Sequence, residues 1–581
     1  MAGRERARFE RNVEIPMRDG TILRADMYSP DDDGPHPVLL SRTPYNKQGA
    51  NVMFDCLKAA GMGYVVVVQD CRGRYNSDGV FYPFLNESQD GYDTIEWIAR
   101  QPWCTGKVGM YGPSYIGATQ WLAAIAQPPH LVTIAPNVTA SDYHDGWTYQ
   151  SGAFLLGFSM SWTLSAFSVP NLARLKPPKE TWTELRDLLV QALDSPASHY
   201  AYVPPRDYPL LKYPGLAPYY YDWLDHPSED EYWKRWKIQD MHDRIKVPVF
   251  NIGGWYDIFL NGTLRNYTGM RERGGSAEAR AATRLFVGPW FHGAPLMGQV
   301  SGEINFGIGA TGIAFGLDDQ QFRWFDYWLK GKKNGITEEP PVSVFTMGEN
   351  RWHRHTQWPP ADVTYQDWFL HSGGKANTLN GDGSLSPEGP GAEGPDHFLY
   401  DPRNPVPTEG GGLCCGPTMS SGGAFDQRAI ESRPDVLVYT SEALQKDLEV
   451  TGPVMVKLWA SSSARDTDFS AKLVDVHPTG YAQNLVDNLV RARYRDSLER
   501  PTLIEPGKPY ELTIDLYGTS NLFKAGHRIR VEVSSSNFPR FDRNTNTGRT
   551  IATDTEMVPA LQTVYHDHAR GSRLVLAVRP R

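Results

Sequence analysis

The chain has 581 residues, of which 40% are hydrophobic and 22% are charged, an ordinary composition for a globular protein. This length exceeds what one hydrophobic core can hold, so about three or four domains are expected. The formal net charge of −9 argues against binding to nucleic acid. We find no run of membrane-spanning length and no apolar signal core near the N-terminus, and therefore expect a cytoplasmic protein.

The cysteines and the glycine-rich runs indicate neither a metal nor a cofactor. There are five cysteines, an odd number, and Cys414 and Cys415 are adjacent, so we predict no disulfide framework and no zinc site. The run GIGATG at 307–312 fits a dinucleotide fingerprint by spacing but lacks a preceding apolar strand, and we interpret it as a loop. No third ligand accompanies the two alternating histidine pairs, His353/His355 and His566/His568.

The first 140 residues alternate between strand and helix patterns. Residues 9–28 alternate in polarity around a central Asp-Gly, which predicts a hairpin. The apolar run 64–68 predicts a buried strand, and the periodicity of 90–100 predicts an amphipathic helix. This alternation predicts a mostly parallel α/β sheet, of which residues 1–140 are the first part.

The pattern changes at residue 141. Residues 141–240 are rich in aromatic side chains and contain a predicted helix at 181–193, so we interpret them as a helical cap over the site. The sheet pattern resumes at Val247, and its last predicted helix spans 317–330. Residues 241–349 are therefore the second part of the α/β core.

Helical periodicity almost vanishes beyond residue 350. The short strands predicted there are 436–439, 454–459, 469–476, 489–494, 512–517, 529–533 and 574–578. Residues 350–581 are thus predicted to form an all-β sandwich or jelly roll, with a Gly/Pro-rich surface loop at 372–396. A sandwich rich in aromatic residues leaves open a carbohydrate-binding protein with a catalytically dead N-terminal part.

A serine stands at a predicted strand-to-helix turn in the run GMYGPSYIG. Gly112 and Ser114 fit the G-x-S-x-G pattern of a nucleophile elbow, in which the serine hydroxyl projects from the top of a sheet. Ile116 stands where the second glycine is expected, and Gly117 follows one position later. The alternative interpretation is an ordinary strand–helix loop.

Two later strand ends carry the groups that would activate such a serine. The sequence GGWYD places Asp257 just after the predicted strand 247–252, and GPWFHG places His292 just after 285–287. The order Ser, Asp, His is the order found in sheet hydrolases, and strand-end loops are where α/β sheets hold their sites. We interpret the rival residues as surface or capping groups: His36, His144, His242, Asp142 and Asp243.

Further motifs extend over nearly the whole chain: RTPYNK (42–47), VVQDCRGRYNSDG (67–79), YDPRNPVP (400–407) and FKAGHRIRVEVSSSNFPRFDRN (523–544). With the three strand-end motifs, they resemble the bacterial cocaine esterase family, which includes α-amino-acid ester hydrolases, glutaryl cephalosporin acylases and, more distantly, X-Pro dipeptidyl-peptidases. The resemblance implies an α/β-hydrolase fold, with Ser114 as nucleophile, His292 as base and Asp257 as its orienting carboxylate. It also implies an oxyanion hole made by the Tyr45 hydroxyl and the backbone N–H of Tyr115.

The residues after Asp257 bear on the acyl group. Members that take α-amino-acid esters hold the substrate ammonium with carboxylates, two of them at the second and third positions after the triad aspartate. Here these positions are Phe259 and Leu260, which offer a cation no partner. With Trp147 and Trp162 from the cap, Phe259 is expected to form an apolar acyl pocket, although each tryptophan could equally be cap core.

We therefore predict a serine hydrolase of carboxylic esters with an apolar or aromatic acyl group. An amide-cleaving acylase of the glutaryl or β-lactam type, or an X-Pro peptidase, is the alternative, because acyl-enzyme chemistry also permits amides. The expected partner is a small-molecule ester or amide, with no nucleic acid, no membrane and no cofactor. A homodimer stays open.

Overall fold

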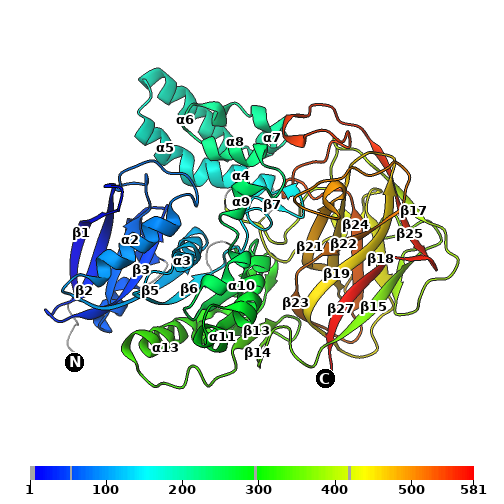
Figure 1. The fold of residues 1–581 in the computed structure, drawn as a ribbon. Helices are drawn as coiled ribbons and strands as arrows, with labels where there is room; N and C mark the ends of the chain where they lie inside the picture. Colours follow the sequence, from blue (N-terminus) through cyan, green and yellow to red (C-terminus); the bar gives the residue numbers. More distant parts are fainter. Residues whose placement is uncertain (1–6, 53–54, 293–297, 416–420) are drawn as a thin grey trace.

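The structure, a computed structural model, describes residues 7–52, 55–292, 298–415 and 421–581. Figure 1 shows a sheet flanked by helices beside a β-sandwich, with a helical layer above the sheet. The predicted fold class is confirmed: an α/β sheet with a cap insertion precedes an all-β domain. The boundaries between these parts stay predictions. Residues 1–6, at the predicted signal-free N-terminus, lie outside the described residues.

The first sheet has ten strands in the described chain, in the order β1-β2-β4-β3-β5-β6-β9-β10-β13-β14. The strands from β4 to β13 pair in parallel, whereas β1, β2 and β14 are antiparallel to their neighbours. Burial on both faces explains why the central strands read as continuous apolar runs. The strands are β1 (Ala7–Pro16), β2 (Ile22–Pro30), β3 (His36–Thr43), β4 (Val65–Asp70), β5 (Cys104–Pro113), β6 (Leu131–Asn137), β9 (Phe250–Tyr256), β10 (Arg284–Phe291), β13 (Val342–Thr346) and β14 (Arg351–His355).

Helices cover this sheet where the sequence periodicity predicts them. The predicted helix 90–100 is α2, and the predicted helix 317–330 has the observed bounds of α13. Gly331 ends α13 in the left-handed conformation, with φ of 70°, which favours glycine. The helices beside the sheet are α1 (Cys56–Gly61), α2 (Glu87–Ala99), α3 (Tyr115–Ile125), α10 (Leu260–Arg273), α11 (Ala277–Ala282), α12 (Gly312–Phe315) and α13 (Leu317–Lys330).

The cap lies above the sheet and shares its core. The predicted helix 181–193 is α6, which buries Leu185, Leu189 and Ala192. Cap aromatics belong to the same hydrophobic cluster as α3, so the cap has no separate core among the described residues. Its elements are β7 (Tyr149–Gln150), β8 (Ala153–Phe154), α4 (Leu156–Trp162), a π-helical segment (Thr163–Ser168), α5 (Val169–Leu175), α6 (Lys179–Asp194), α7 (Pro196–Tyr200), α8 (Pro218–Asp225) and α9 (Glu231–Lys234).

The C-terminal half is a β-sandwich whose core continues into side chains of β9, β10 and β13 of the first sheet. The predicted bounds 489–494 are wrong: β21 ends at Arg491, and a 3-10 turn follows. The predicted loop 372–396 contains the unpredicted strand β16, and β15, β17, β23, β25 and β26 (Arg570–Gly571) were not predicted either. The main strands are β15 (Thr364–His371), β16 (Ser384–Ser386), β17 (Asp396–Tyr400), β18 (Leu437–Ser441), β19 (Leu448–Ser462), β20 (Asp468–Val476), β21 (Ala482–Arg491), β22 (Tyr510–Asp515), β23 (Thr519–Phe523), β24 (Arg528–Ser534), β25 (Ala560–Asp567) and β27 (Arg573–Arg579).

The sandwich contacts the two elements that lie closest to the predicted site. Trp255 and Tyr256, at the end of β9, pack into the sandwich core, and the Tyr256 hydroxyl donates to the Asn484 carbonyl at 3.0 Å. In the cap, the backbone N–H of Phe154 donates to Asp542 at 3.0 Å. The sandwich thus holds both the turn after β9 and the start of the cap.

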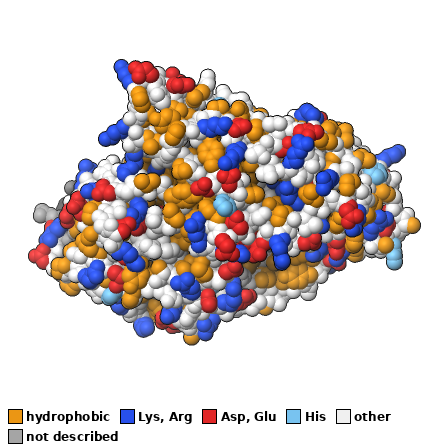
Figure 2. All heavy atoms as spheres, turned by 45° about the horizontal axis from the view of Figure 1, so that its top comes forward, with side chains coloured by type: hydrophobic (Ala, Val, Ile, Leu, Met, Phe, Trp, Pro, Cys, Tyr) orange, Lys and Arg blue, Asp and Glu red, His pale blue; other side chains and the backbone are white. Residues whose placement is uncertain are grey.

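The surface carries mixed charge. On the face in Figure 2, Lys and Arg side chains are interspersed with Asp and Glu, and hydrophobic side chains are scattered between them. Among the described residues, no helix combines the length and apolar character needed to cross a membrane. The prediction that nucleic acid is not a partner is untested by these observations.

Candidate active site

Ser114 lies between β5 and α3 in a rare backbone conformation. The strand ends at Pro113 and the helix begins at Tyr115, and Ser114 has φ of 59° and ψ of −125°. A residue other than glycine at positive φ is strained, and such strain is typical of a serine held on a sharp strand-to-helix turn. Its N–H donates to the Asn137 carbonyl of β6 at 2.9 Å, which ties the turn to the sheet.

The departure from the G-x-S-x-G pattern has a steric explanation. A Cβ atom on Gly112 would lie 2.4 Å from the Cγ2 atom of Ile116, so the missing side chain at 112 leaves room for isoleucine. A Cβ on Gly117 would lie 2.9 Å from the Thr139 side chain, so this glycine allows α3 to approach the segment after β6. The tight turn therefore exists with its second glycine shifted by one residue.

Ser114, His292 and Asp257 form one continuous chain of hydrogen bonds. The Ser114 Oγ atom lies 3.1 Å from Nε2 of His292, and Nδ1 of the same ring lies 2.8 Å from Oδ2 of Asp257. Because the carboxylate accepts from Nδ1, Nε2 is left to accept the serine proton. The second oxygen of Asp257 accepts the Phe259 N–H at 2.7 Å, which fixes the carboxylate.

The three residues come from the carboxyl ends of β5, β9 and β10. Asp257 directly follows β9, and His292 directly follows β10. Their side chains are only 0% and 9% exposed, respectively, so the hydrogen bonds are shielded from water. The structure therefore brings together all three residues that the sequence singled out.

The rival histidines His144 and His242 are buried, so their interpretation as surface or capping residues is wrong. His144 Nε2 lies 3.0 Å from the Pro227 carbonyl, and His242 Nε2 lies 3.0 Å from Asn266. Burial lowers the pKa of both, that of His242 to about 4. Asp142 is buried as well, and burial raises its pKa to about 7. The buried histidines complete structural contacts away from the triad.

The Tyr45 hydroxyl lies beside the serine. It makes a hydrogen bond with the Ser114 side chain, and its oxygen accepts the indole N–H of Trp162 at 3.0 Å. Burial raises the pKa of Tyr45 to about 12, although these two hydrogen bonds act in the opposite direction. The phenol therefore keeps its proton at neutral pH and can donate it to an oxyanion.

Tyr115 is the first residue of α3, where a backbone N–H has no partner within the helix. Its side chain is buried beneath the turn: its hydroxyl accepts the Phe84 N–H at 2.8 Å and donates to Glu87 at 2.9 Å. Glu87 also forms a buried ion pair with Arg42, at 2.8 Å. This network holds the start of α3, and with it the N–H of Tyr115. Sequence reasoning missed the Arg42–Glu87 pair.

Phe259 and Trp147 lie next to the histidine. The Phe259 ring meets His292 edge to face, with centroids 5.1 Å apart, and stacks on Trp147 with centroids 4.3 Å apart. Both aromatic side chains are fully buried. Trp162 is packed against Trp147 and gives its N–H to Tyr45. The predicted pocket residues thus form one aromatic cluster beside His292, in which Trp162 also holds the Tyr45 hydroxyl.

A separate pocket adjoins the other side of the elbow. It is lined by residues of β3, the Tyr45 segment, the end of β5 and α3, among them Thr43, Tyr45, Pro113 and Ile116.

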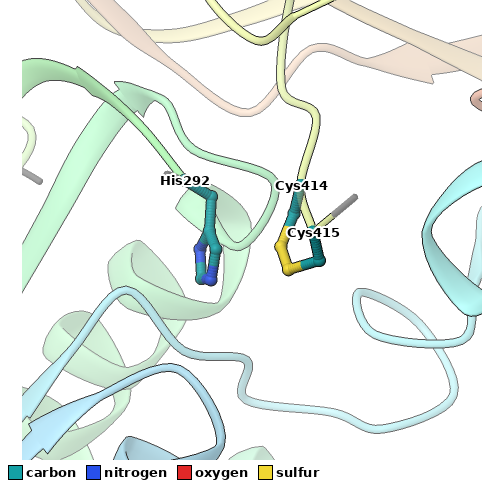
Figure 3. A group of neighbouring side chains, drawn as sticks. All are labelled: His292, Cys414 and Cys415. Atoms are coloured by element: carbon teal, nitrogen blue, oxygen red, sulfur yellow. A yellow bond between two sulfur atoms is a disulfide. The ribbon is translucent and has the colours of Figure 1, made fainter. Parts of the chain in front are cut away.

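Cys414 and Cys415 reach the site from the C-terminal half. Figure 3 shows both side chains next to His292, and a disulfide joins them. A disulfide between adjacent residues joins no distant parts of the chain, so it provides no disulfide framework. This bond was not predicted from the sequence. The signal that could have found it is the adjacency of the two cysteines itself.

Comparisons with known proteins place the chain in a family. Cocaine esterase from Rhodococcus sp. (strain MB1 Bresler) is 40% identical over 98% of this chain and 98% of its own length. The chain belongs to the cocaine esterase family. The models for the X-Pro dipeptidyl-peptidase S15 family and for the C-terminal non-catalytic domain of X-Pro dipeptidyl-peptidase match residues 19–294 and 334–575.

Less similar proteins also match over most of their length. A Mycobacterium bovis protein provisionally named a serine esterase is 26% identical over 91% of this chain and 90% of its own length. Among solved structures, an α-amino-acid ester hydrolase has a TM-score of 0.79 at 26% identity, covering 100% of this chain and 98% of its own. An aminopeptidase from a marine sediment Thaumarchaeota archaeon has a TM-score of 0.80 at 25% identity, covering 98% and 96%.

Proposed function

We propose that this protein is a serine hydrolase that cleaves carboxylic esters with an apolar or aromatic acyl group through an acyl-serine intermediate. The observation that carries the proposal is the unbroken chain of hydrogen bonds from Ser114 through His292 to Asp257, with the Tyr45 hydroxyl beside the serine. Membership of the cocaine esterase family supports it.

In the proposed reaction, Ser114 attacks the ester carbonyl while Nε2 of His292 accepts the hydroxyl proton. Asp257 keeps the ring in the productive tautomer and stabilises the imidazolium that forms. The Tyr45 hydroxyl and the Tyr115 N–H donate to the developing oxyanion. Loss of one such donor costs about 2.7–4 kcal/mol of barrier in comparable sites. The histidine then protonates the leaving alcohol and later activates water for deacylation.

The aromatic cluster favours an apolar acyl group. Phe259 is buried in the cluster of cap aromatics and Leu260 in the cluster of the sandwich core, at the positions where a substrate ammonium would need carboxylates. An unpaired ammonium would lose its hydration there without compensation. The likeness to an α-amino-acid ester hydrolase is therefore one of fold, and the proposed acyl preference differs from the one in that protein's name.

Amide cleavage is the second candidate, because acyl-enzyme chemistry is common to both and because the matched family model bears the name of a peptidase. A glutaryl-type acylase or an X-Pro peptidase would need a group for the second carboxylate or for the substrate amine. A sugar-binding role for the sandwich and a homodimer both stay predictions. A sugar-binding assay on the full chain tests the first, and the mass of the protein in solution tests the second.

The test is hydrolysis of p-nitrophenyl acetate, butyrate, benzoate and an α-aminoacyl ester, together with the matching anilides, by the wild type and by Ser114→Ala. We expect cleavage of the apolar and aromatic esters and its loss in Ser114→Ala. An unchanged rate in the variant would show that Ser114 is not the nucleophile. Cleavage of the aminoacyl ester alone would overturn the assignment of the acyl pocket.

A further inference from the structure

Two sulfur atoms and an imidazole meet at the active site, and none of the roles above uses the sulfurs. A ring nitrogen of His292 and the Sγ atoms of Cys414 and Cys415 all lie within 4.8 Å of one another. Figure 3 shows the two cysteines side by side and facing the histidine. Cys414 is 5% exposed. Because Nδ1 of the ring is engaged by Asp257, a cation would bind Nε2 and displace the Ser114 hydroxyl, which lies 3.1 Å from that nitrogen.

The segment that carries the cysteines is fixed in place. Gly411 and Gly423 exchange two backbone hydrogen bonds, of 2.7 and 3.0 Å, at its base. A Cβ atom on Gly412 would lie 3.2 Å from the Asp257 carbonyl oxygen, so the segment runs against the turn that holds the triad carboxylate. On the other side, the Ser165 hydroxyl of the cap donates to the Cys415 carbonyl at 3.3 Å. These contacts hold Gly412 and Cys415 through backbone and glycine positions and do not involve the sulfur atoms.

We propose that the reduced Cys414–Cys415 pair and His292 form a binding site for a thiophilic divalent cation such as Zn²⁺ or Cd²⁺, and that the cation inhibits the enzyme. Two thiolates and one imidazole are ligands that such cations prefer. With bonds of about 2.0–2.3 Å, the ligand atoms of a tetrahedral Zn²⁺ lie roughly 3.3–3.8 Å apart, so the two sulfurs must move apart after reduction to bind it. The Asp257 carboxylate already supports the ring from its other nitrogen, as at many metal-bound histidines.

The chemistry balances with a named reductant. A trialkylphosphine and water convert the disulfide into two thiols and the phosphine oxide. The cation then replaces the two thiol protons, which leave to solvent, and accepts the lone pair of Nε2. A histidine whose Nε2 is coordinated cannot accept the proton of Ser114. The disulfide form has no thiolates, so it does not hold the cation and stays active.

Binding is measured first, without reference to catalysis. Ser114→Ala is reduced with the phosphine, the phosphine is removed, and Cd²⁺ is titrated while the thiolate-to-cadmium charge-transfer absorption is followed. We expect one cadmium per chain on thiolates, no such absorption in the unreduced protein, and its loss in the further variants Cys414→Ser and Cys415→Ser. His292→Gln should weaken binding by roughly tenfold or more. The matched control Cys104→Ser removes a buried thiol at the opposite end of β5 and should retain the site.

Two outcomes would overturn the proposal. One is a reduced protein that shows no thiolate–cadmium absorption, and the other is a titration that is unchanged in Cys414→Ser and Cys415→Ser. Because a substituted chain could fail to fold, phenylarsine oxide provides a second test on the unmutated protein. It bridges neighbouring thiols, so it should consume both and compete with Cd²⁺, and a lack of competition would place the metal elsewhere.

Inhibition rests on the proposed function and is measured separately. Zn²⁺ should inhibit ester hydrolysis by the reduced enzyme and leave the oxidised enzyme active, each rate being compared with that of the same sample without metal. Another group of the described residues, Asp475, His477 and His527 in the sandwich, could also hold a cation. His527→Ala should leave the inhibition in place, and loss of inhibition in that variant would contradict the proposal. If the reduced protein bound cadmium but the chain had no esterase activity, the proposed function would be refuted and the metal site would stand.

Discussion

The indole N–H of Trp162 donates a 3.0 Å hydrogen bond to the hydroxyl oxygen of Tyr45. A phenol that accepts a proton on one side turns its own proton to another side, and here its other partner is Ser114. The tryptophan therefore orients the donor that we assign to the oxyanion hole. The two residues are 117 positions apart, on the segment after β3 and at the end of α4.

Removal of this donor should slow the chemical step more than it weakens binding. Tyr45→Phe is expected to lower kcat by about 10²–10³ with little change in KM, since the hydroxyl acts on the oxyanion. Trp162→Phe should lower kcat by a smaller factor and leave KM unchanged, because it only releases the orientation of Tyr45. The matched control is Trp324→Phe, which removes a buried indole donor to Thr133 and should leave kcat unchanged.

Asp257→Asn should lower kcat by about 10⁴, because the amide favours the wrong histidine tautomer. Binding of a non-hydrolysable substrate analogue and the melting temperature should change little, since the amide fits the same space. Steady-state kinetics with p-nitrophenyl butyrate and a thermal melt measure both effects. A loss of less than tenfold would mean that Asp257 does not orient the base.

Phe259→Leu should reduce the preference for aromatic acyl groups. Ring–ring contacts contribute about 0.5–1.5 kcal/mol, so kcat/KM for a benzoate ester should fall roughly 2–10-fold relative to butyrate. Phe250→Leu is the matched control, because it removes a buried, stacked ring of β9 facing Phe286 rather than the triad. Equal changes for both esters in Phe259→Leu would show that this ring does not contact the acyl group.

The sandwich contains an ion pair that should make stability depend on pH. His566 Nε2 lies 2.9 Å from Asp396 Oδ2, and both side chains are 0% exposed. Burial alone would lower the pKa of His566, but the hydrogen bond and charge of Asp396 and the charge of Glu393 raise it above its usual value. Burial likewise opposes ionisation of Asp396, whereas hydrogen bonds from His566, the Ala376 N–H and Ser372 hold its pKa below the usual range.

The raised pKa of His566 and the lowered pKa of Asp396 stabilise the folded protein over different pH ranges. The raised pKa of His566 stabilises the fold fully below about pH 6.5 and ceases to do so as the pH rises through the folded value. The lowered pKa of Asp396 stabilises it above about pH 4 and is lost as the pH falls through the folded value. His566→Gln should therefore destabilise the protein most between about pH 4 and 6.5, by about 3–5 kcal/mol.

Denaturant unfolding measures the difference in stability between the wild type and His566→Gln at about pH 5.5, inside this range, and at about pH 9, above it. The matched control is His36→Gln, because His36 pairs with the largely exposed Asp32 and such pairs contribute about 0–1 kcal/mol. The ion pair would be excluded as a source of the pH dependence if the His566 variant lost the same stability at both pH values.

Much of the candidate site could be read from local pattern. Ser114, Asp257 and His292 each follow a short apolar run, and the carboxyl ends of parallel strands lie along one edge of a sheet. Chain order then assigned their roles without any long-range contact. The strand bounds in the sandwich were less accessible: the prediction 489–494 overlaps only the last three residues of β21, because the burial of a strand there depends on which neighbours cover each face.

The sequence by itself determined the fold class, the chain order of the triad and the apolar character of Phe259 and Leu260, because hydrophobic periodicity and turn residues act over a few neighbouring positions. Only the tertiary structure decided that Trp162 serves Tyr45, that Glu87 pairs with Arg42 beneath α3, and that Cys414 and Cys415 lie beside His292. These contacts join elements that are far apart in the chain. A hydrogen bond or a ligand set depends on distances of a few ångströms, and only the packing of the three layers sets those distances.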